Sequence, residues 1–353
     1  DLMVTAPYWR TDVQLADDLI EEIARIIGYD EIPTTMLRGE IPERMPAPLP
    51  ALKETIQDFL VGCGMQEIIT YSLVSQAMLD KIDPHRKISP ALRAANPMTL
   101  EQEYLRTNLR AGLLAAFSAN EKREHNSIRL FEVGKVYFPR GDDLPEEREM
   151  LAGVLGGPKF DRSWLSGEDM LDFFDAKGVL ETVFSRLQVV ASFEPVEDPN
   201  LVPGRTAEIV VNGQKVGVLG EVHPRTAGAF DISSQPVSLF EVDLEKLLSF
   251  VGAVLTYQPI PRFPGIVRDL ALVMDTGLAA SKVQGIIQSF PLVSQVTLFD
   301  VYSGDQVPGG KKSLAFSIRY QSLQRTLTDE EVDGTQQEIV ERLQRELGAT
   351  LRS

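Results

Sequence analysis

The order of elements in the last hundred residues constrains the fold more than any other feature of this sequence. The pattern predicts, in chain order, a strand at 268–274, a helix at 279–289, strands at 295–302 and 313–321, a helix at 328–348 and a strand at 349–352. The β-α-β-β-α-β order is that of the ferredoxin-like split βαβ motif. Its two helices cover one face of the sheet, so we expect the other face to be available for a partner.

The middle of the chain, residues 43–256, mixes helices and strands without regular alternation. Helical patterns are predicted at 51–63, 111–120 and 176–187, and β-rich runs at 66–72, 128–138, 208–211, 214–220 and 237–242. Asn212-Gly213 is a good hairpin turn between two of these runs. This mixture favours an α+β fold with an antiparallel sheet over a doubly wound parallel sheet.

The first 42 residues predict the end of a small helical domain. Leu15, Leu19, Ile23 and Ile27 recur at a spacing of four over residues 13–28, which indicates an amphipathic helix. Four prolines within residues 38–50 then predict a linker. We therefore expect three parts, at 1–42, 43–256 and 257–353. The chain begins with Asp rather than Met, inside a strand-like run, so we interpret it as a fragment.

The charge of the chain is strongly acidic and unevenly distributed. The formal net charge is −16, which argues against nucleic-acid binding over the whole surface. Residues 257–353 contain 10 basic and 11 acidic side chains, whereas residues 1–256 contain 25 and 40. The last part is therefore the one least repulsive to a polyanion.

The cysteine count and hydropathy indicate the compartment. Cys63 is the single cysteine, which excludes an internal disulfide and a cysteine-cluster zinc site. No run approaches the roughly 18 apolar residues that a membrane-spanning helix needs. We expect a cytoplasmic protein that does not bind membranes.

Short ordered runs along the whole chain carry a family resemblance. In the last part they are 299–302 (FDVY), 310–314 (GKKSL) and 325–331 (RTLTDEE); before it come 7–12 (PYWRTD), 172–178 (DFFDAKG), 203–205 (PGR) and 220–224 (GEVHP). The last part resembles the ferredoxin-fold anticodon-binding domain of bacterial phenylalanyl-tRNA synthetase β subunits, and the earlier runs resemble the synthetase-like domain of that family and the domain ahead of it. The family's editing domain would precede this sequence, so we expect no editing.

The resemblance implies a β-subunit portion of phenylalanine–tRNA ligase that is inactive alone. It implies packing on the catalytic α subunit in an (αβ)₂ assembly, docking of the anticodon of phenylalanine tRNA, and use of ATP through the α subunit; no DNA partner is expected. A second hypothesis is a free-standing module that binds RNA or a small ligand. The middle domain discriminates between the two, because a subunit should expose a large apolar face.

The middle domain resembles a class II synthetase catalytic domain without its ATP-binding arginines. Such domains need guanidinium groups that stabilise the negative charge of the phosphates. Residues 105–107 resemble the run that leads into the first arginine motif, but Phe138-Pro139 stands where the arginine is expected, and an acidic run at 240–246 replaces the last glycine-rich turn. We therefore expect a degenerate catalytic fold without an ATP site, in which Arg106 and Glu132 belong to a structural ion pair.

Four acidic residues near the N-terminus are candidate metal ligands. Asp18, Glu21 and Glu22 share one face of the expected helix, and Asp12 can fold over its first turn. Converging carboxylates suit Mg²⁺, and the resemblance implies a magnesium site at the same four positions. The alternative is an acidic first turn that complements the helix dipole without a metal.

RNA recognition is assigned to the last domain by the resemblance. Proteins that recognise RNA stack exposed bases on aromatic rings or arginines and neutralise phosphates. On the strand 313–321, the face opposite the apolar side chains presents polar and basic residues. The candidate anticodon contacts are Lys311, Lys312, Arg319, Gln321 and Arg352. The alternative is that these side chains are an ordinary solvated surface.

Overall fold

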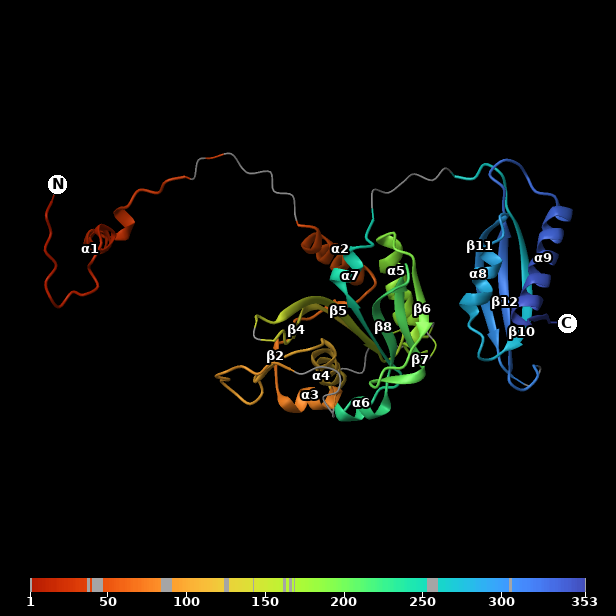
Figure 1. The fold of residues 1–353 in the computed structure, drawn as a ribbon, viewed down its shortest axis with the longest axis horizontal. Coiled ribbons are helices and arrows are strands. Elements are labelled where there is room, and N and C mark those ends of the chain that lie inside the picture. Colours follow the sequence, from red (N-terminus) through yellow and green to blue (C-terminus); the bar gives the residue numbers. More distant parts are fainter. Residues whose placement is uncertain are drawn as a thin grey trace. The chain divides into compact units, whose positions relative to one another are not determined.

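The chain forms two compact units, Asp1–Ala253 (unit 1) and Val254–Ser353 (unit 2), in a computed structural model (Figure 1). The structure describes residues 2–36, 39, 47–83, 91–123, 127–141, 143–160, 163–164, 167, 169–252, 260–304 and 307–352. The domain boundaries expected near residues 42 and 256 lie outside these residues. No helix among them is long and apolar enough to cross a membrane.

A seven-stranded sheet forms the centre of unit 1, in the order β1-β4-β5-β9-β8-β7-β6. Every neighbouring pair is antiparallel except β1 with β4. The strands are β1 (Gln66–Glu67), β4 (Ile128–Phe138), β5 (Glu146–Gly156), β6 (Ala191–Pro195), β7 (Leu201–Val211), β8 (Gln214–Val222) and β9 (Val237–Asp243). This arrangement confirms the predicted α+β class with a mainly antiparallel sheet. A separate two-stranded ribbon pairs β2 (Leu73–Val74) with β3 (Tyr104–Leu105).

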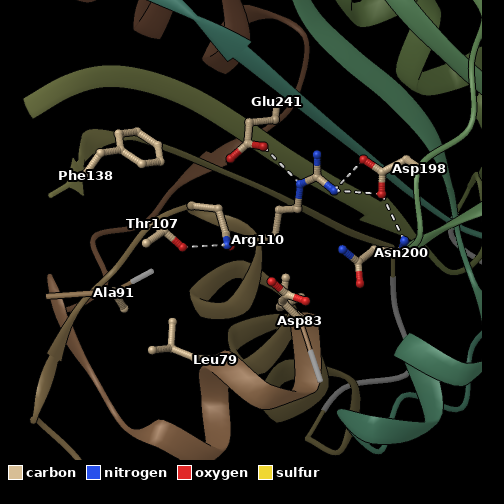
Figure 2. Close-up of a pocket in the computed structure, with 11 residues that line it drawn as sticks. Leu79, Asp83, Ala91, Thr107, Arg110, Phe138, Asp198, Asn200 and Glu241 are labelled. Atoms are coloured by element: carbon tan, nitrogen blue, oxygen red, sulfur yellow. Dashed lines mark hydrogen bonds and ion pairs between the residues drawn. The ribbon is translucent and has the colours of Figure 1, made fainter. Parts of the chain in front are cut away.

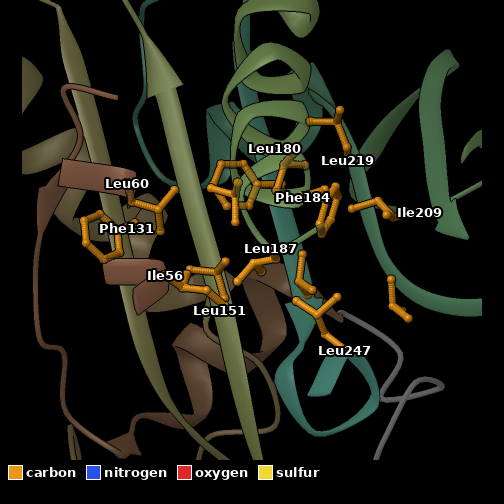
Figure 3. Packing of buried hydrophobic residues seen from close by; sticks show 14 of the residues in the cluster. Ile56, Leu60, Phe131, Leu151, Leu180, Phe184, Leu187, Ile209, Leu219 and Leu247 are labelled. Atoms are coloured by element: carbon orange, nitrogen blue, oxygen red, sulfur yellow. The ribbon is translucent and has the colours of Figure 1, made fainter. Parts of the chain in front are cut away.

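Helices cover both faces of this sheet, so its strands are apolar on both sides. On one face, Phe131 and Leu151 of the sheet pack in a cluster with side chains of α2 (Pro48–Gly62), α5 (Phe173–Arg186) and α7 (Leu244–Leu248) (Figure 3). On the other face, Leu130, Ala152 and Val154 belong to a second cluster with α4 (Arg110–Glu121). Successive residues of a strand point to opposite faces, which is why neighbours such as Leu130 and Phe131 enter different cores. Two shorter helices, α3 (Gln76–Ile82) and α6 (Pro224–Ala229), contribute to the second cluster.

The predicted linker over residues 38–50 is wrong at its end, because α2 already begins at Pro48. A proline in the first turn of a helix lacks only an N–H that has no helical partner there. The expected strand at 66–72 is also shorter, since only Gln66–Glu67 pairs within the sheet.

Unit 2 has the predicted β-α-β-β-α-β order. Its antiparallel sheet has the order β11-β12-β10-β13. The elements are β10 (Ile266–Asp275), α8 (Ala280–Gln288), β11 (Val293–Tyr302), β12 (Lys311–Tyr320), α9 (Asp329–Leu347) and β13 (Thr350–Leu351). Leu314, Phe316, Ile318 and Tyr320 are buried in one core with both helices. The ferredoxin-like prediction is therefore confirmed.

The N-terminal segment contains α1 (Ala16–Ile27) and a short 3₁₀ turn at Tyr29–Glu31. No residue of α1 is buried by the part of the chain that the structure describes. The predicted apolar stripe is present, but Ile20, Ile23 and Ile26 are exposed.

Candidate functional sites

The predicted metal ligands do not converge on a common point, and Arg10 lies between two of them. The Nη2 atom of Arg10 lies 2.7 Å from Oδ2 of Asp12 and 2.6 Å from Oε1 of Glu22. One oxygen of Asp18 accepts the backbone N–H groups of Gln14 and Leu15, each at 2.7 Å. Among the described residues, no three histidine, cysteine or acidic side chains are placed to hold a metal. As placed, these residues do not fit a bound Mg²⁺.

The hydrogen bonds explain the ionisation of these groups. Hydrogen bonds from Arg10 lower the pKa of Asp12 and Glu22, and backbone N–H groups lower that of Asp18. Asp18 therefore serves the start of α1, as the alternative without a metal expects. The three carboxylates stay charged at neutral pH and remain available to a cation that displaces Arg10.

The open sheet face of unit 2 is the candidate RNA interface. Because Leu314, Phe316 and Ile318 point into the helical core, the alternate residues of β12 lie on the opposite face. Here Ser313 pairs with Tyr302 and Val273 on the two neighbouring strands, and Arg319 pairs with Gln295. We call this surface the open sheet face and define it by Tyr302, Lys311, Ser313, Arg319 and Arg352.

The structure brings only part of the predicted RNA-binding set onto this face. Lys311 and Arg319 lie on it, at the two ends of β12. Lys312 has the same alternation as the core residue Leu314, so it lies on the helical side. The side chain of Gln321 donates a hydrogen bond to the carbonyl of Phe263 at 2.7 Å, which anchors it within unit 2.

Arg352 forms the centre of the open sheet face together with two residues that were not predicted. Its guanidinium lies 5.2 Å from the centroid of the Tyr302 ring, and its Nη1 lies 3.5 Å from Oγ of Ser313. Ser313 is only 2% exposed. RNA-binding proteins stack bases on aromatic rings, and Tyr302 places such a ring on this face. In the sequence, Tyr302 stood out only as part of the 299–302 run. Its pairing with Ser313 could not be predicted, because it depends on a β-bulge between Leu298 and Asp300.

Arg106 and Glu132 form a buried ion pair, as predicted. Nη1 of Arg106 lies 2.6 Å from Oε1 of Glu132, and Nε of Arg106 donates to the carbonyl of Lys135 at 2.8 Å. The hydroxyl of Thr70 donates to the other oxygen of Glu132 at 2.7 Å. Nε and Nη1 of Arg106 and both carboxylate oxygens of Glu132 are thus bonded within the described fold, as expected for a structural ion pair.

The acidic residues of β9 also have structural partners. Oδ1 of Asp243 accepts the N–H of Lys246 at 3.0 Å, which caps the start of α7. Oε2 of Glu241 lies 2.9 Å from Nε of Arg110. Both carboxylates are buried. They belong to the acidic run that stands in place of the expected glycine-rich turn.

Two large apolar side chains are exposed beside the edge strand β1. Ile69 is 90% exposed and Tyr71 is 77% exposed. They are two positions apart in an extended segment that follows β1, where the N–H of Ile68 donates to the carbonyl of Phe131 at 2.8 Å. Alternate residues of an extended segment point the same way, so the pair forms a small apolar surface.

Comparison with known proteins identifies one family along the chain. The family model of the phenylalanyl-tRNA synthetase beta chain CLM domain matches residues 32–244, the ferredoxin-fold anticodon binding domain matches 261–352, and the tRNA synthetase B5 domain matches 1–29. The phenylalanine–tRNA ligase beta subunit of Dehalococcoides mccartyi strain ATCC BAA-2266 is 42% identical over 346 residues, which are 98% of this chain and 42% of that protein.

Two further curated relatives and one solved structure are also similar to this chain. The phenylalanine–tRNA ligase beta subunits of Halalkalibacterium halodurans and Geobacillus kaustophilus are each 38% identical over 99% of this chain and 44% of their own length. The chain thus spans less than half of the curated relatives that it matches. The structure of a pyrrolysyl-tRNA synthetase from Desulfitobacterium hafniense aligns with a TM-score of 0.45 and 18% identity, over 59% of this chain and 74% of that chain.

Proposed function

The chain belongs to the family of phenylalanine–tRNA ligase β subunits, and from this premise we propose that it supports the ligation of phenylalanine to its tRNA without catalysing it alone. In this proposal, unit 1 packs on the catalytic α subunit of an (αβ)₂ assembly, and unit 2 docks the anticodon of phenylalanine tRNA. ATP is used through the α subunit. The open sheet face, within the matched anticodon-binding domain, is the observation that carries the proposal.

The open sheet face offers the two interactions that a single-stranded anticodon requires. The ring of Tyr302, with the Arg352 guanidinium over it, provides a planar surface on which a base can stack. Lys311, Arg319 and Arg352 supply positive charge for phosphates. The buried hydroxyl of Ser313 lies beneath this cluster, where it positions the Arg352 side chain.

Binding of phenylalanine tRNA to the chain assembled with its α subunit tests this role. We expect Tyr302→Ala to weaken binding by about tenfold or more, because stacking contributes roughly 1–3 kcal/mol per base. Arg345→Ala, which removes a cation from the helical side at α9, is the matched control and should bind as the unaltered chain does. If Tyr302→Ala binds tRNA with unchanged affinity, the open sheet face is not the docking surface.

Packing on the α subunit would cover the apolar surface of Ile69 and Tyr71. We expect the double substitution Ile69→Asp and Tyr71→Asp to reduce co-purification of a tagged α subunit, because two charges would be buried without partners. Leu144→Asp, at an equally exposed apolar residue, is the control. A chain that stays apart from the α subunit and binds tRNA tightly alone would instead support the free-standing RNA-binding module.

Mg²⁺ at Asp12, Asp18, Glu21 and Glu22 remains part of the proposal as a cofactor. The placement of Arg10 between two of these carboxylates means that the ion must displace it.

We also propose a cytoplasmic location, which the free thiol of Cys63 fits because disulfides are rare there.

A further inference from the structure

A small cavity lies in unit 1 and shares no residue with the predicted metal ligands or the open sheet face (Figure 2); the Arg110–Glu241 ion pair described above forms part of its wall. Its volume is about 190 Å³, which is enough for several waters or one small organic molecule. Leu79, Ile82 and Phe138 form an apolar part of its wall. Arg110, Asp198, Asn200 and Glu241 form a polar part, and they come from a helix, a turn and a sheet strand that are distant in sequence.

One buried carboxylate, Glu241, and one partly buried carboxylate, Asp198, hold one guanidinium at this wall. Figure 2 shows Arg110 between Glu241 and Asp198. Nε of Arg110 lies 2.9 Å from Glu241, and Nη1 lies 3.0 and 2.9 Å from the two oxygens of Asp198. Burial acts to lower the pKa of Arg110, but the two carboxylates together hold it above its usual value. At their formal charges, the guanidinium and the two carboxylates together carry a net charge of −1.

The carboxylates keep acceptor capacity that these bonds do not use. Among the described residues, Glu241 accepts only from Arg110 and, at 3.3 Å, from the backbone N–H of Leu109. An ionised carboxylate offers about four lone-pair positions. A positively charged donor in the cavity would meet both the spare lone pairs and the excess negative charge, whereas an anion would be repelled.

Asn200 lacks a partner at the same wall. It is 4% exposed, its backbone N–H donates to Asp198 and its carbonyl accepts from the N–H of His223. Its side-chain Nδ2 is buried and has no hydrogen-bond partner among the described residues. Leaving a buried donor unpaired costs about 1–3 kcal/mol, so an acceptor is missing at this position.

We propose that this cavity binds a small organic cation that carries an ammonium group and a hydrogen-bond acceptor next to an apolar body. The ammonium group interacts with Glu241 and Asp198. The acceptor receives the N–H of Asn200, and the apolar body packs on Leu79, Ile82 and Phe138. The site is independent of the proposed tRNA and α-subunit contacts, since none of its residues belongs to those surfaces.

Three small probes test the proposal by calorimetry on the chain. They are 2-amino-2-phenylethanol, which has the ammonium, the hydroxyl acceptor and the apolar ring; benzylamine, which lacks the hydroxyl; and benzoate, which replaces the cation with an anion. We expect the amino alcohol to bind about five- to tenfold more tightly than benzylamine, from one added hydrogen bond, and benzoate not to bind. Absence of amine binding, or equal binding of benzoate, would overturn the proposal.

Variants assign the binding to the cavity. Asn200→Ala removes the unpaired donor, so the chain should stay folded and bind the amino alcohol no better than benzylamine. Glu241→Gln keeps an acceptor for Arg110 but removes a charge, and should weaken both amines. Asn120→Ala is the matched control, because that exposed asparagine on α4 donates to the carbonyl of Ala116, away from the cavity. If Asn200→Ala keeps the preference for the amino alcohol, the assignment is wrong.

Discussion

At the scale of single residues, Gly134 shows how tightly unit 1 is built around its buried ion pair. The residue lies on β4 beside Arg106 and Glu132. A Cβ atom at this position would clash with Nη2 of Arg106, whose other nitrogens are committed to Thr70, Glu132 and Lys135. The guanidinium cannot move without leaving a buried partner unpaired.

Gly134→Ala should therefore destabilise unit 1. We expect a loss of about 1–3 kcal/mol in the free energy of unfolding, which is typical of overpacking, measured by urea unfolding followed by circular dichroism. Gly178→Ala is the matched control, because a Cβ there meets nothing within 4 Å inside α5. In a helix interior this exchange should stabilise by roughly 0.5–1 kcal/mol. Equal effects of the two substitutions would contradict the clash.

Arg10 is the residue that decides whether the N-terminal acidic group can hold Mg²⁺. It bridges Asp12 and Glu22, while Arg25 contacts Glu22 alone, at 2.6 Å. Arg10→Ala should raise the affinity for Mg²⁺ because it frees Asp12 and Oε1 of Glu22, and Arg25→Ala should have a smaller effect because it frees only Oε2 of Glu22. Calorimetric titration with Mg²⁺ measures both. Failure of every variant to bind Mg²⁺ would exclude the four-carboxylate site.

At the scale of elements, the sequence predicted a helix that begins at residue 328, and Thr328 is the N-cap of α9. Thr328 and Glu331 form a capping box, in which Glu331 accepts the N–H of Thr328 at 3.0 Å and Thr328 accepts that of Glu331. Arg325 adds an ion pair to Glu331. These hydrogen bonds, led by the one from Arg325, lower the pKa of Glu331 to about 2.

The lowered pKa of Glu331 makes the stability of α9 dependent on pH in a defined range. A carboxylate with a depressed folded-state pKa stabilises above its unfolded pKa, and that contribution disappears as the pH falls toward the folded value. Glu331→Gln should therefore lower the melting temperature of unit 2 at pH 6, with the difference from the unaltered chain shrinking between pH 4.5 and about 2. For Glu330→Gln, in the same turn, the difference in melting temperature from the unaltered chain should not shrink over this pH range. A difference that is constant with pH would contradict the role of the charge.

Elements that depend on distant pairing could not be predicted from local patterns. The β5 strand lies between β4 and β9, yet it begins with Glu146, Glu147 and Arg148 and does not read as a buried strand. Its apolar half from Leu151 is buried only because helices cover both faces of the sheet. The cavity wall likewise joins Arg110 to Glu241, 131 positions away, and periodicity contains no information about that pairing.

At the scale of the whole molecule, charge is divided between the parts of the chain. The sequence already predicted this, because residues 257–353 are almost neutral while the rest is strongly acidic. It could not predict that the cations of unit 2 divide further, with Lys311, Arg319 and Arg352 on the open sheet face and Lys312 on the helical side. That division follows from strand register, which a β-bulge shifts in β11.

This division predicts a modest salt dependence for tRNA binding. Three cations on the open sheet face would release about three counterions, so the logarithm of the binding constant should fall with the logarithm of salt concentration with a slope of about −2, at roughly −0.7 per contact with a single strand. Arg319→Ala should reduce the magnitude of the slope by about 0.7, whereas Lys312→Ala should leave it unchanged because Lys312 lies on the other face. Filter binding between 50 and 200 mM salt, a range over which counterion release is readily measured, gives both slopes. If Arg319→Ala and Lys312→Ala reduce the magnitude of the slope equally, RNA also contacts the helical side. The position of a cation on one face of the sheet would then not decide whether it contributes to binding.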